Sequence, residues 1–151
     1  MSLRDLRAAR RAARDEDGAP KGVHVLTAIH GVGSVVCAVL SAGSAVSVGF
    51  RQSLARTGGS RLMVASFGDW TWAFLLFIAG ILATLSYGSW NRRRYTWPLT
   101  LAVYSVGVLG SLWQVSVGID EAWVSAVINA GVVAYAASPG VRRAYGWRST
   151  G

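Results

Sequence analysis

The sequence is poor in the residues on which most protein chemistry depends. It has one cysteine, Cys37, which excludes an internal disulfide and a cysteine-based metal cluster, and only two histidines. None of the motifs HExxH, GxSxG, CxxC or Walker A occurs. Asp120 and Glu121 are neighbours in the chain, so they do not form a pair facing across a site. We therefore expect a non-enzymatic protein with no metal and no cofactor.

Charge is also scarce, and its distribution matters more than its amount. Charged residues make up 15% of the 151 residues, against about a quarter in a typical soluble domain, and 52% are hydrophobic. The charges gather at the ends and connections, leaving long uncharged segments, which is typical of a membrane protein. The net charge of +8 does not indicate nucleic-acid binding, because the basic residues flank apolar segments.

One short polar stretch, residues 89–98, separates two long apolar runs and contains Arg92, Arg93 and Arg94. Burying three arginines at the centre of a bilayer would cost about 8–10 kcal/mol on insertion scales. This stretch must therefore lie at a membrane surface, and the positive-inside rule favours the cytoplasmic side.

The whole chain divides into one membrane domain, residues 21–140, between two basic tails, residues 1–20 and 141–151. Four apolar segments predict an all-α membrane protein, a four-transmembrane-helix bundle with spans at about 23–49, 70–88, 97–117 and 121–138. We expect residues 1–20 to be a solvated tail, with a short basic helix on the lipid surface as the alternative. The first span is too long for a signal-peptide core, so we expect it to be retained.

The helix ends have recognisable signals. Asp69 and Asp120 are expected to cap the second and fourth spans, and Pro98 suits the first turn of the third. Pro139-Gly140 is expected to end the fourth span. The connection 50–69 is expected to turn at Gly58-Gly59, with its apolar residues 62–67 either interfacial or the first turns of the second span.

The basic residues predict the orientation. With four spans, the two tails, the adjoining Lys21 and the Arg92–Arg94 stretch share one face and hold 12 of the 15 lysines and arginines. This asymmetry predicts that both the N- and C-termini are cytoplasmic in a multi-pass protein of the plasma (cell) membrane. Tryptophans and tyrosines recur near the expected ends of the spans, where aromatic side chains favour the membrane interface.

Small residues indicate how the helices pack, because helices in lipid associate through close backbone approach. The fourth span has alanines four residues apart: Ala122, Ala126, Ala130 and Ala134. The first span has Ser34, Ala38 and Ala42 in the same rhythm. We expect the first span to pack closely on the fourth, with the third on the other side of the fourth.

Two polar residues inside the spans are candidates for a function. Intramembrane ionisable groups are expensive and often functional, which draws attention to His30. The alternative is a structural histidine that Ser34, Tyr104 or Tyr135 satisfies at similar depth. For Asn129 we expect either a hydrogen bond to a neighbouring helix or a position lining a polar path. Arg92, Arg93 and Arg94 set the topology, and with Arg142 and Arg143 they form a candidate contact for lipid headgroups or an acidic partner.

Two stretches carry a resemblance to known proteins. Residues 87–99, in which a glycine–tryptophan helix end precedes the arginines and a second tryptophan, resemble the loop between spans two and three of small prokaryotic four-span integral membrane proteins of unknown function. Residues 129–146 are similar to the usual ending of those proteins. The resemblance covers the four spans, but neither the tail 1–20 nor the connection 50–69, and it implies no activity or binding residue.

Two main hypotheses of function remain, and an enzyme that acts on lipid ranks third. The first is an accessory or interaction subunit of a membrane assembly, with the lipid bilayer, anionic lipids, and a membrane-protein partner or a second copy as its contacts. The alternative is a small oligomeric transporter or channel protomer in which His30 and Asn129 line a polar path.

Overall fold

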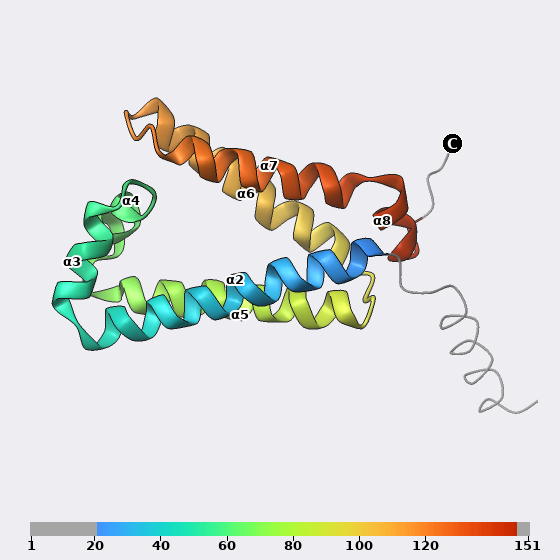
Figure 1. Ribbon diagram of the computed structural model, residues 1–151, viewed down its shortest axis with the longest axis horizontal. Coiled ribbons are helices and arrows are strands. Elements are labelled where there is room, and N and C mark those ends of the chain that lie inside the picture. Colours follow the sequence, from blue (N-terminus) through green and yellow to red (C-terminus); the bar gives the residue numbers. More distant parts are fainter. Residues whose placement is uncertain (1–20, 148–151) are drawn as a thin grey trace, which may run out of the picture.

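The computed structural model describes residues 21–147, and all regular structure among them is helical (Figure 1). The elements in chain order are α2 (Lys21–Val46), α3 (Val48–Arg56), α4 (Gly58–Phe67), the 3-10 turn η1 (Gly68–Trp70), α5 (Thr71–Trp90), α6 (Thr96–Ser116), α7 (Ala122–Ala137) and α8 (Pro139–Ala144). The predicted all-α class is confirmed. The predicted tail of residues 1–20 lies outside the described residues.

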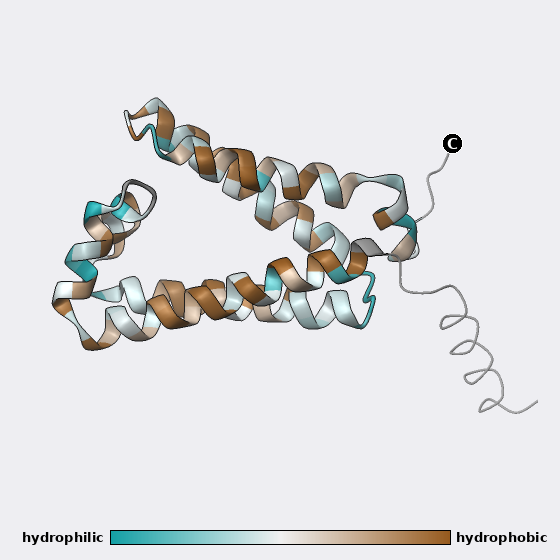
Figure 2. Ribbon diagram, in the orientation of Figure 1, coloured by the Kyte–Doolittle hydropathy of each residue, from teal (hydrophilic) through white to brown (hydrophobic). Residues whose placement is uncertain are grey.

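Three helices are long and apolar enough to cross a membrane. These are Val23–Val46, Ser60–Trp90 and Thr96–Ser116. Only 11% of the most apolar part of the third is buried within the chain, so most of its surface needs an apolar environment. Apolar residues fill the middle of the helices and hydrophilic ones gather near the two ends (Figure 2). The fourth apolar helix, Ala122–Ala137, is shorter.

The long helices form two antiparallel pairs. α2 lies alongside α5, and α6 lies alongside α7 (Figure 1). The pairs meet at the end of the molecule that holds the α5–α6 connection and α8, and they diverge toward the other end. The prediction that the first span packs on the fourth is therefore wrong, because the main partner of α2 is α5. The pairing of the third span with the fourth is confirmed.

One cluster of buried residues joins the two pairs, and we call it the junction core. It consists of Val23, Leu26, Val132, Ala136, Val141 and Tyr145, with partly buried neighbours such as Leu101 and Trp97 around it. Its members come from α2, α7 and the C-terminal segment, and α6 adds its first turns. α2 and α7 thus belong to one core only near this end.

Hydroxyl groups hold α2 against α5. Ser34 donates to the carbonyl of Ala79 at 2.9 Å, Ser41 to Trp72 at 2.7 Å, and Ser86 to Thr27 at 3.0 Å. Each bond joins a side chain of one helix to the backbone of the other. Such bonds, together with small side chains, replace the hydrophobic driving force that is missing between helices in lipid. Of the expected series on the first span, only Ser34 meets α5, whereas Ala38 and Ala42 are exposed, so that prediction is wrong. The small residues buried further along α2 are Ser41 and Ser44.

The alanine series on α7 is only half buried. Ala122 and Ala126 are buried, whereas Ala130 and Ala134 are exposed, so the prediction of one continuous packing face is wrong. Four residues exceed one helical turn, so each step of four rotates the side chain by about 40°. After two steps the series has left the interface, and the buried face continues through Val132 and Ala136.

This difference gives a matched pair of variants. Ala126→Leu should lower the apparent melting temperature in detergent, because the added atoms must enter the α6–α7 interface at a cost of about 1–3 kcal/mol. Ala130→Leu should leave it nearly unchanged. Equal effects of the two substitutions, measured by thermal unfolding of the purified proteins, would contradict the observed rotation of α7.

The connection 50–69 is not an open loop with a turn at Gly58-Gly59, as we expected. Ser47 accepts a hydrogen bond from the Phe50 amide at 3.1 Å and begins α3, and α2 accordingly ends before residue 49. Extended backbone at Thr57 separates α3 from α4, and Gly58 and Gly59 form the first turn of α4. The apolar residues 62–67 belong to α4, within the apolar segment that continues into α5.

Two of the predicted helix caps are wrong. The side chain of Asp69 does not cap α5, but pairs with Arg51 at 2.6 Å. α7 begins after Glu121 with no side-chain cap, so Asp120 does not perform this role. Pro98 does lie in the first turn of α6. Pro139 follows the end of α7 as predicted, and it also opens α8, where its missing N–H is no loss.

Candidate functional site

His30 lies where α2, α5 and α6 meet, and its side chain is fully buried. Its Nδ1 is 3.4 Å from the Ser89 hydroxyl, which is long for a hydrogen bond, and its ring is 5.6 Å from the ring of Tyr104. Its Nε2 has no hydrogen-bond partner among the described residues. The predicted neighbour Ser34 instead bonds Ala79, so that assignment is wrong, whereas Tyr104 is a neighbour through its ring.

Sequence reasoning missed Ser89 because it placed this residue in a surface stretch. α5 continues to Trp90, which carries Ser89 into the protein, where it is fully buried. Ser89 lies 59 positions from His30. No local spacing connects two residues so far apart, and only the pairing of α2 with α5 brings them together.

Three other buried hydroxyl groups lie near the same end, those of Thr96, Thr100 and Tyr145. The side-chain oxygens of these three have no hydrogen-bond partner among the described residues. Thr96, Thr100 and Tyr104 are four residues apart on α6 and share its inner side. This arrangement can donate and accept hydrogen bonds, but it contains no carboxylate. Within residues 21–147, no cluster of histidine, cysteine and acidic residues is suited to a metal ion.

Tyr145, which follows α8, gives a pH-dependent prediction. Burial raises the pKa of its phenol above the ordinary value of 10.0, and the nearby Ser89 hydroxyl opposes part of this rise. Since the unfolded phenol ionises first, stability should fall as the pH rises above 10. Tyr145→Phe should lose less stability than the wild type between pH 9 and pH 11.

The same variant should be as stable as the wild type at pH 7, because it removes a buried hydroxyl that makes no bond meeting hydrogen-bond geometry. Melting temperatures across this pH range measure both effects. A marked loss of stability in Tyr145→Phe at pH 7 would show that the hydroxyl has an essential partner.

Asn129 lies at a different interface, between α6 and α7. Its Nδ2 donates to the Ser125 carbonyl at 2.8 Å, and Ser125 also contacts Ser111 through their hydroxyls at 3.1 Å. Gly107 makes room for the amide, since a Cβ there would lie 2.7 Å from Asn129 Oδ1. Asn129 therefore packs against α6 but bonds its own helix, so the predicted hydrogen bond to a neighbouring helix is wrong. Its side chain is not brought to His30, which contacts α5 and Tyr104.

The α5–α6 connection and the C-terminal segment, which carry the arginines, do come together, as expected for neighbouring third and fourth spans. Trp147 donates from Nε1 to the carbonyl of Arg94 at 3.3 Å, and its ring is 5.3 Å from that of Trp97. Trp97 bonds the Ala136 carbonyl at 2.8 Å, and Arg142 lies 5.7 Å over its ring. We call this surface, formed by Arg92, Arg93, Arg94, Trp97, Arg142, Arg143 and Trp147, the arginine–tryptophan face.

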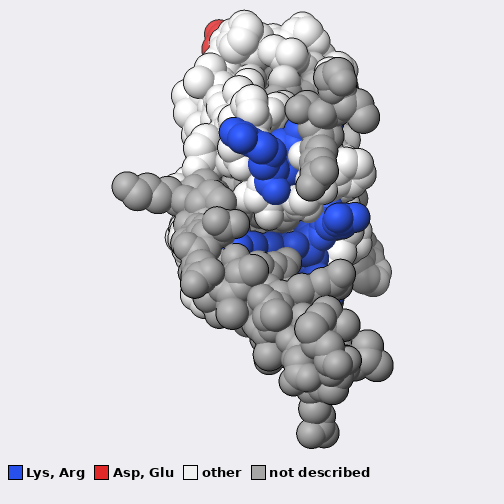
Figure 3. Space-filling view, turned by 90° about the vertical axis from the view of Figure 1, so that its right-hand side faces the viewer, with Lys and Arg blue, Asp and Glu red and all other residues white. Residues whose placement is uncertain are grey.

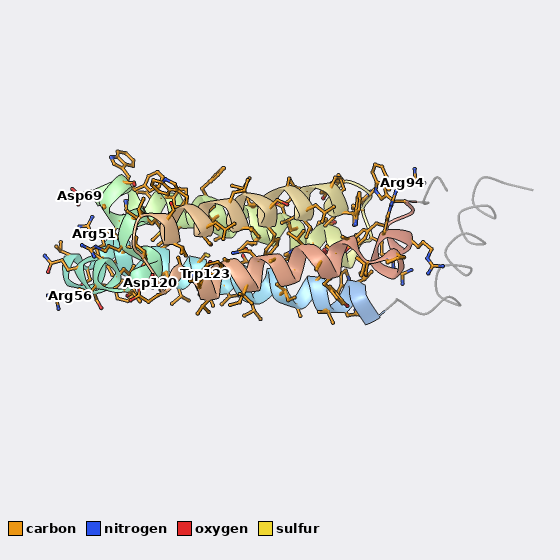
Figure 4. The ribbon with its side chains drawn as sticks, turned by 90° about the horizontal axis from the view of Figure 1, so that it is seen from above. Arg51, Arg56, Asp69, Arg94, Asp120 and Trp123 are labelled. Carbon is orange, nitrogen blue, oxygen red and sulfur yellow. The ribbon has the colours of Figure 1, made fainter. Side chains whose placement is uncertain are left out.

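The carboxylates of the described residues are confined to one end of the molecule, where arginines are also present. Arg94 is at one end, whereas Arg51, Arg56, Asp69 and Asp120 are at the other (Figure 4). Among the residues coloured by charge, the end-on view shows basic side chains in two groups and acidic atoms at the margin (Figure 3). Among the described residues, the three carboxylates are Asp69, Asp120 and Glu121, and all belong to the far end.

An open groove of about 390 Å³ runs along the α2–α5 pair. It is lined by Thr27, Gly31, Ser34, Ala83, Ser86, Tyr87 and Trp90. Its three small hydroxyls already bond backbone carbonyls of α2 or α5. The groove therefore provides shape rather than chemical groups, and we assign no reaction to it.

The comparisons with known proteins return no match: no family model, no curated protein and no solved structure is similar to this chain. The resemblance to small four-span membrane proteins stays a prediction from the two stretches that carry it. Function must be argued from the geometry alone.

Proposed function

We propose that this protein is a non-enzymatic, multi-pass protein of the plasma membrane that works as an accessory or interaction subunit of a membrane assembly. In this proposal all four apolar helices cross the bilayer and both termini are cytoplasmic. The observation that carries it is the divergence of the two helix pairs. Each pair is held together by its own bonds, while the junction core joins them near one end and only a slight contact of α4 with α7 joins them near the other.

Divergent pairs leave helix faces that a compact four-helix bundle would cover. Ala130 and Ala134 on α7 are exposed, and Val124 and Val127 are 65% and 66% exposed. Small side chains on an exposed intramembrane face let another helix approach closely, whereas lipid tails gain little from them. A membrane-protein partner or a second copy of the chain fits such a face.

Length and charge support the fourth crossing. The 16 residues of α7 span about 24 Å, somewhat less than the roughly 30 Å of hydrocarbon. Asp120 and Glu121 at one end and Arg142 and Arg143 at the other bracket this helix with opposite charges. The basic end belongs to the cytoplasm by the positive-inside rule.

The orientation is tested by cysteine labelling in intact cells. A Cys37→Ser background receives either Gln52→Cys, in α3, or Gly140→Cys, in α8, both of which are exposed positions. A membrane-impermeant maleimide should label Gln52→Cys directly and Gly140→Cys only after permeabilisation. The reverse pattern would overturn the orientation, and recovery of the protein in the soluble fraction after alkaline extraction would overturn the membrane placement.

The interaction role is tested by purification in mild detergent, with mass spectrometry and mass determination of the complex. Wild type should carry a membrane protein or a second copy in fixed ratio, and Ala130→Phe/Ala134→Phe should lose it while staying folded. Val106→Phe is the matched control, since this side chain is 69% exposed on α6. A wild-type monomer free of any partner would contradict the proposal.

Transport remains the alternative, and the buried, unpartnered Nε2 of His30 is the observation that favours it. His30 and Asn129 belong to interfaces of different helix pairs, which weighs against one path lined by both. If transport is the function, His30→Ala should abolish proton flux in proteoliposomes while the melting temperature and partner content are retained. Unchanged flux in that variant would exclude this role for His30.

A further inference from the structure

The arginine–tryptophan face assembles positive charge from two segments far apart in the sequence. Gly146 has a φ of +76°, and a Cβ at this position would lie 3.2 Å from Arg94 Nε, so the Arg94 side chain lies against the C-terminal turn. The Gly146 amide bonds the Arg143 carbonyl at 2.9 Å in that same turn. The Arg94 side chain and the Arg143 backbone therefore meet at one turn, and the Arg143 side chain runs along α8, where its Nε donates to the Pro139 carbonyl at 3.2 Å.

The tryptophans hold this arrangement in place. Trp147 bonds the backbone of Arg94, Trp97 bonds the backbone of α7, and the two rings contact each other. Arg142 packs over Trp97 and contributes to the same structure. Arg93, Arg94 and Arg143 are exposed on it. These positive charges add to one potential at this end of the molecule, which favours an anion there.

The described part of the chain does not supply that anion. Its carboxylates, Asp69, Asp120 and Glu121, all lie at the opposite end of the molecule. One of them, Asp69, is already paired with Arg51 at 2.6 Å. A positive-inside signal requires only that arginines stay on one side of the membrane. It does not require a bonded platform that fixes arginines of two segments together.

We propose that the arginine–tryptophan face binds the phosphate group of an anionic phospholipid headgroup. Arg94 and Arg143 bind the phosphate oxygens, because the planar guanidinium matches a phosphate with two parallel N–H donors. Trp97 and Trp147 lie at headgroup level, where tryptophan is favoured, and keep the arginines at that depth. The inference rests on the membrane placement in the proposed function and is independent of any protein partner.

The probe is phosphatidylglycerol against phosphatidylcholine. The full chain is purified in neutral detergent, equilibrated with an equimolar mixture of the two lipids, and its bound lipids are counted by native mass spectrometry. Wild type should retain phosphatidylglycerol selectively. Each arginine near an anionic surface raises the affinity for anionic lipid roughly fivefold, so Arg94→Gln/Arg143→Gln should lower the selectivity for phosphatidylglycerol by about 25-fold. Arg94→Lys/Arg143→Lys keeps the charge and should retain a measurable part of it.

The matched control is Arg56→Gln/Arg61→Gln, which removes the same charge from exposed positions at the opposite end. It should keep the wild-type selectivity, and an equal loss in both double variants would reduce the effect to net charge and overturn the proposal. Selectivity retained by a folded Arg94→Gln/Arg143→Gln would also overturn it. Circular dichroism and gel filtration establish that each variant is folded.

Two further arms separate the sources of the anion. Inorganic phosphate at millimolar concentration should not displace the lipid, and full displacement would assign the face to free phosphate. The acidic residues Asp15, Glu16 and Asp17 of the N-terminal tail are the internal alternative. If the wild type does not bind phosphatidylglycerol but Asp15→Asn/Glu16→Gln/Asp17→Asn does, the tail is the native counter-charge and the lipid proposal fails. If the protein has no partner but still selects this lipid, the accessory role fails and this inference stands.

Discussion

Replacing Gly88 by alanine should cause a large loss of stability. Gly88 is buried in the last turns of α5, and an added Cβ would collide with Thr96 Oγ1 and would lie 3.1 Å from the Tyr95 hydroxyl. Thr96 is a short, fully buried side chain at the start of α6, so it cannot move aside without shifting the helix. Overpacking of this kind costs about 1–3 kcal/mol, and here we expect the upper end.

The measurement is the apparent melting temperature in detergent, followed by the fraction that remains monodisperse on heating. Gly80→Ala is the control on the same helix, because nothing lies within 4 Å of a Cβ there. Thr96→Ala removes the colliding oxygen, which is itself unpaired, and should restore part of the stability of Gly88→Ala. If Gly88→Ala and Gly80→Ala are equally stable, the close approach of α5 to α6 is wrong.

Gly107→Ala should destabilise the α6–α7 pair by displacing Asn129. The added Cβ would lie 2.7 Å from Asn129 Oδ1 and 2.9 Å from its Cγ, so the amide must leave the position from which it bonds Ser125. The lost bond and the distorted packing together should cost about 2 kcal/mol. Gly110→Ala, with nothing within 4 Å of its Cβ, should have little effect.

A double-mutant cycle makes this prediction specific. Asn129→Ala alone should cost about 1 kcal/mol or less, as intramembrane side-chain hydrogen bonds usually do. In Gly107→Ala/Asn129→Ala the added methyl no longer meets the amide, so the double variant should lose less stability than the sum of the two single variants. Strict additivity in thermal unfolding would show that Gly107 and Asn129 do not share one space.

The apolar segments were predictable because their signal is local. A run of about twenty residues without charge, ended by arginines or by Pro139, identifies a helix from composition alone, and the observed ends of α6 differ from the predicted ones by a single residue. Pro98 was placed correctly for the same reason. The connection 50–69 was not, because Gly58 and Gly59 favour a turn locally, whereas Ser47 accepts the Phe50 amide at the start of α3 and Ser60 bonds the Leu54 carbonyl across the α3–α4 break.

The partners of the helices were not predictable from spacing. Small residues occur on the first, third and fourth spans alike, and their rhythm does not say which face meets which helix. In the structure Ser34 and Ser41 bond backbone carbonyls of α5, a helix that follows the whole α3–α4 segment. Ala130 and Ala134 share a rhythm with Ala126 but have rotated out of the interface.

The sequence by itself determined that this protein is helical, where its long apolar helices run, and at which positions its arginines collect, because burying charge in hydrocarbon is costly at any point of the chain. Only the tertiary structure decided that α2 pairs with α5, that His30 faces Ser89, and that Arg94 lies on the turn at Gly146. These contacts join residues dozens of positions apart, and their free energy depends on how whole helices approach one another.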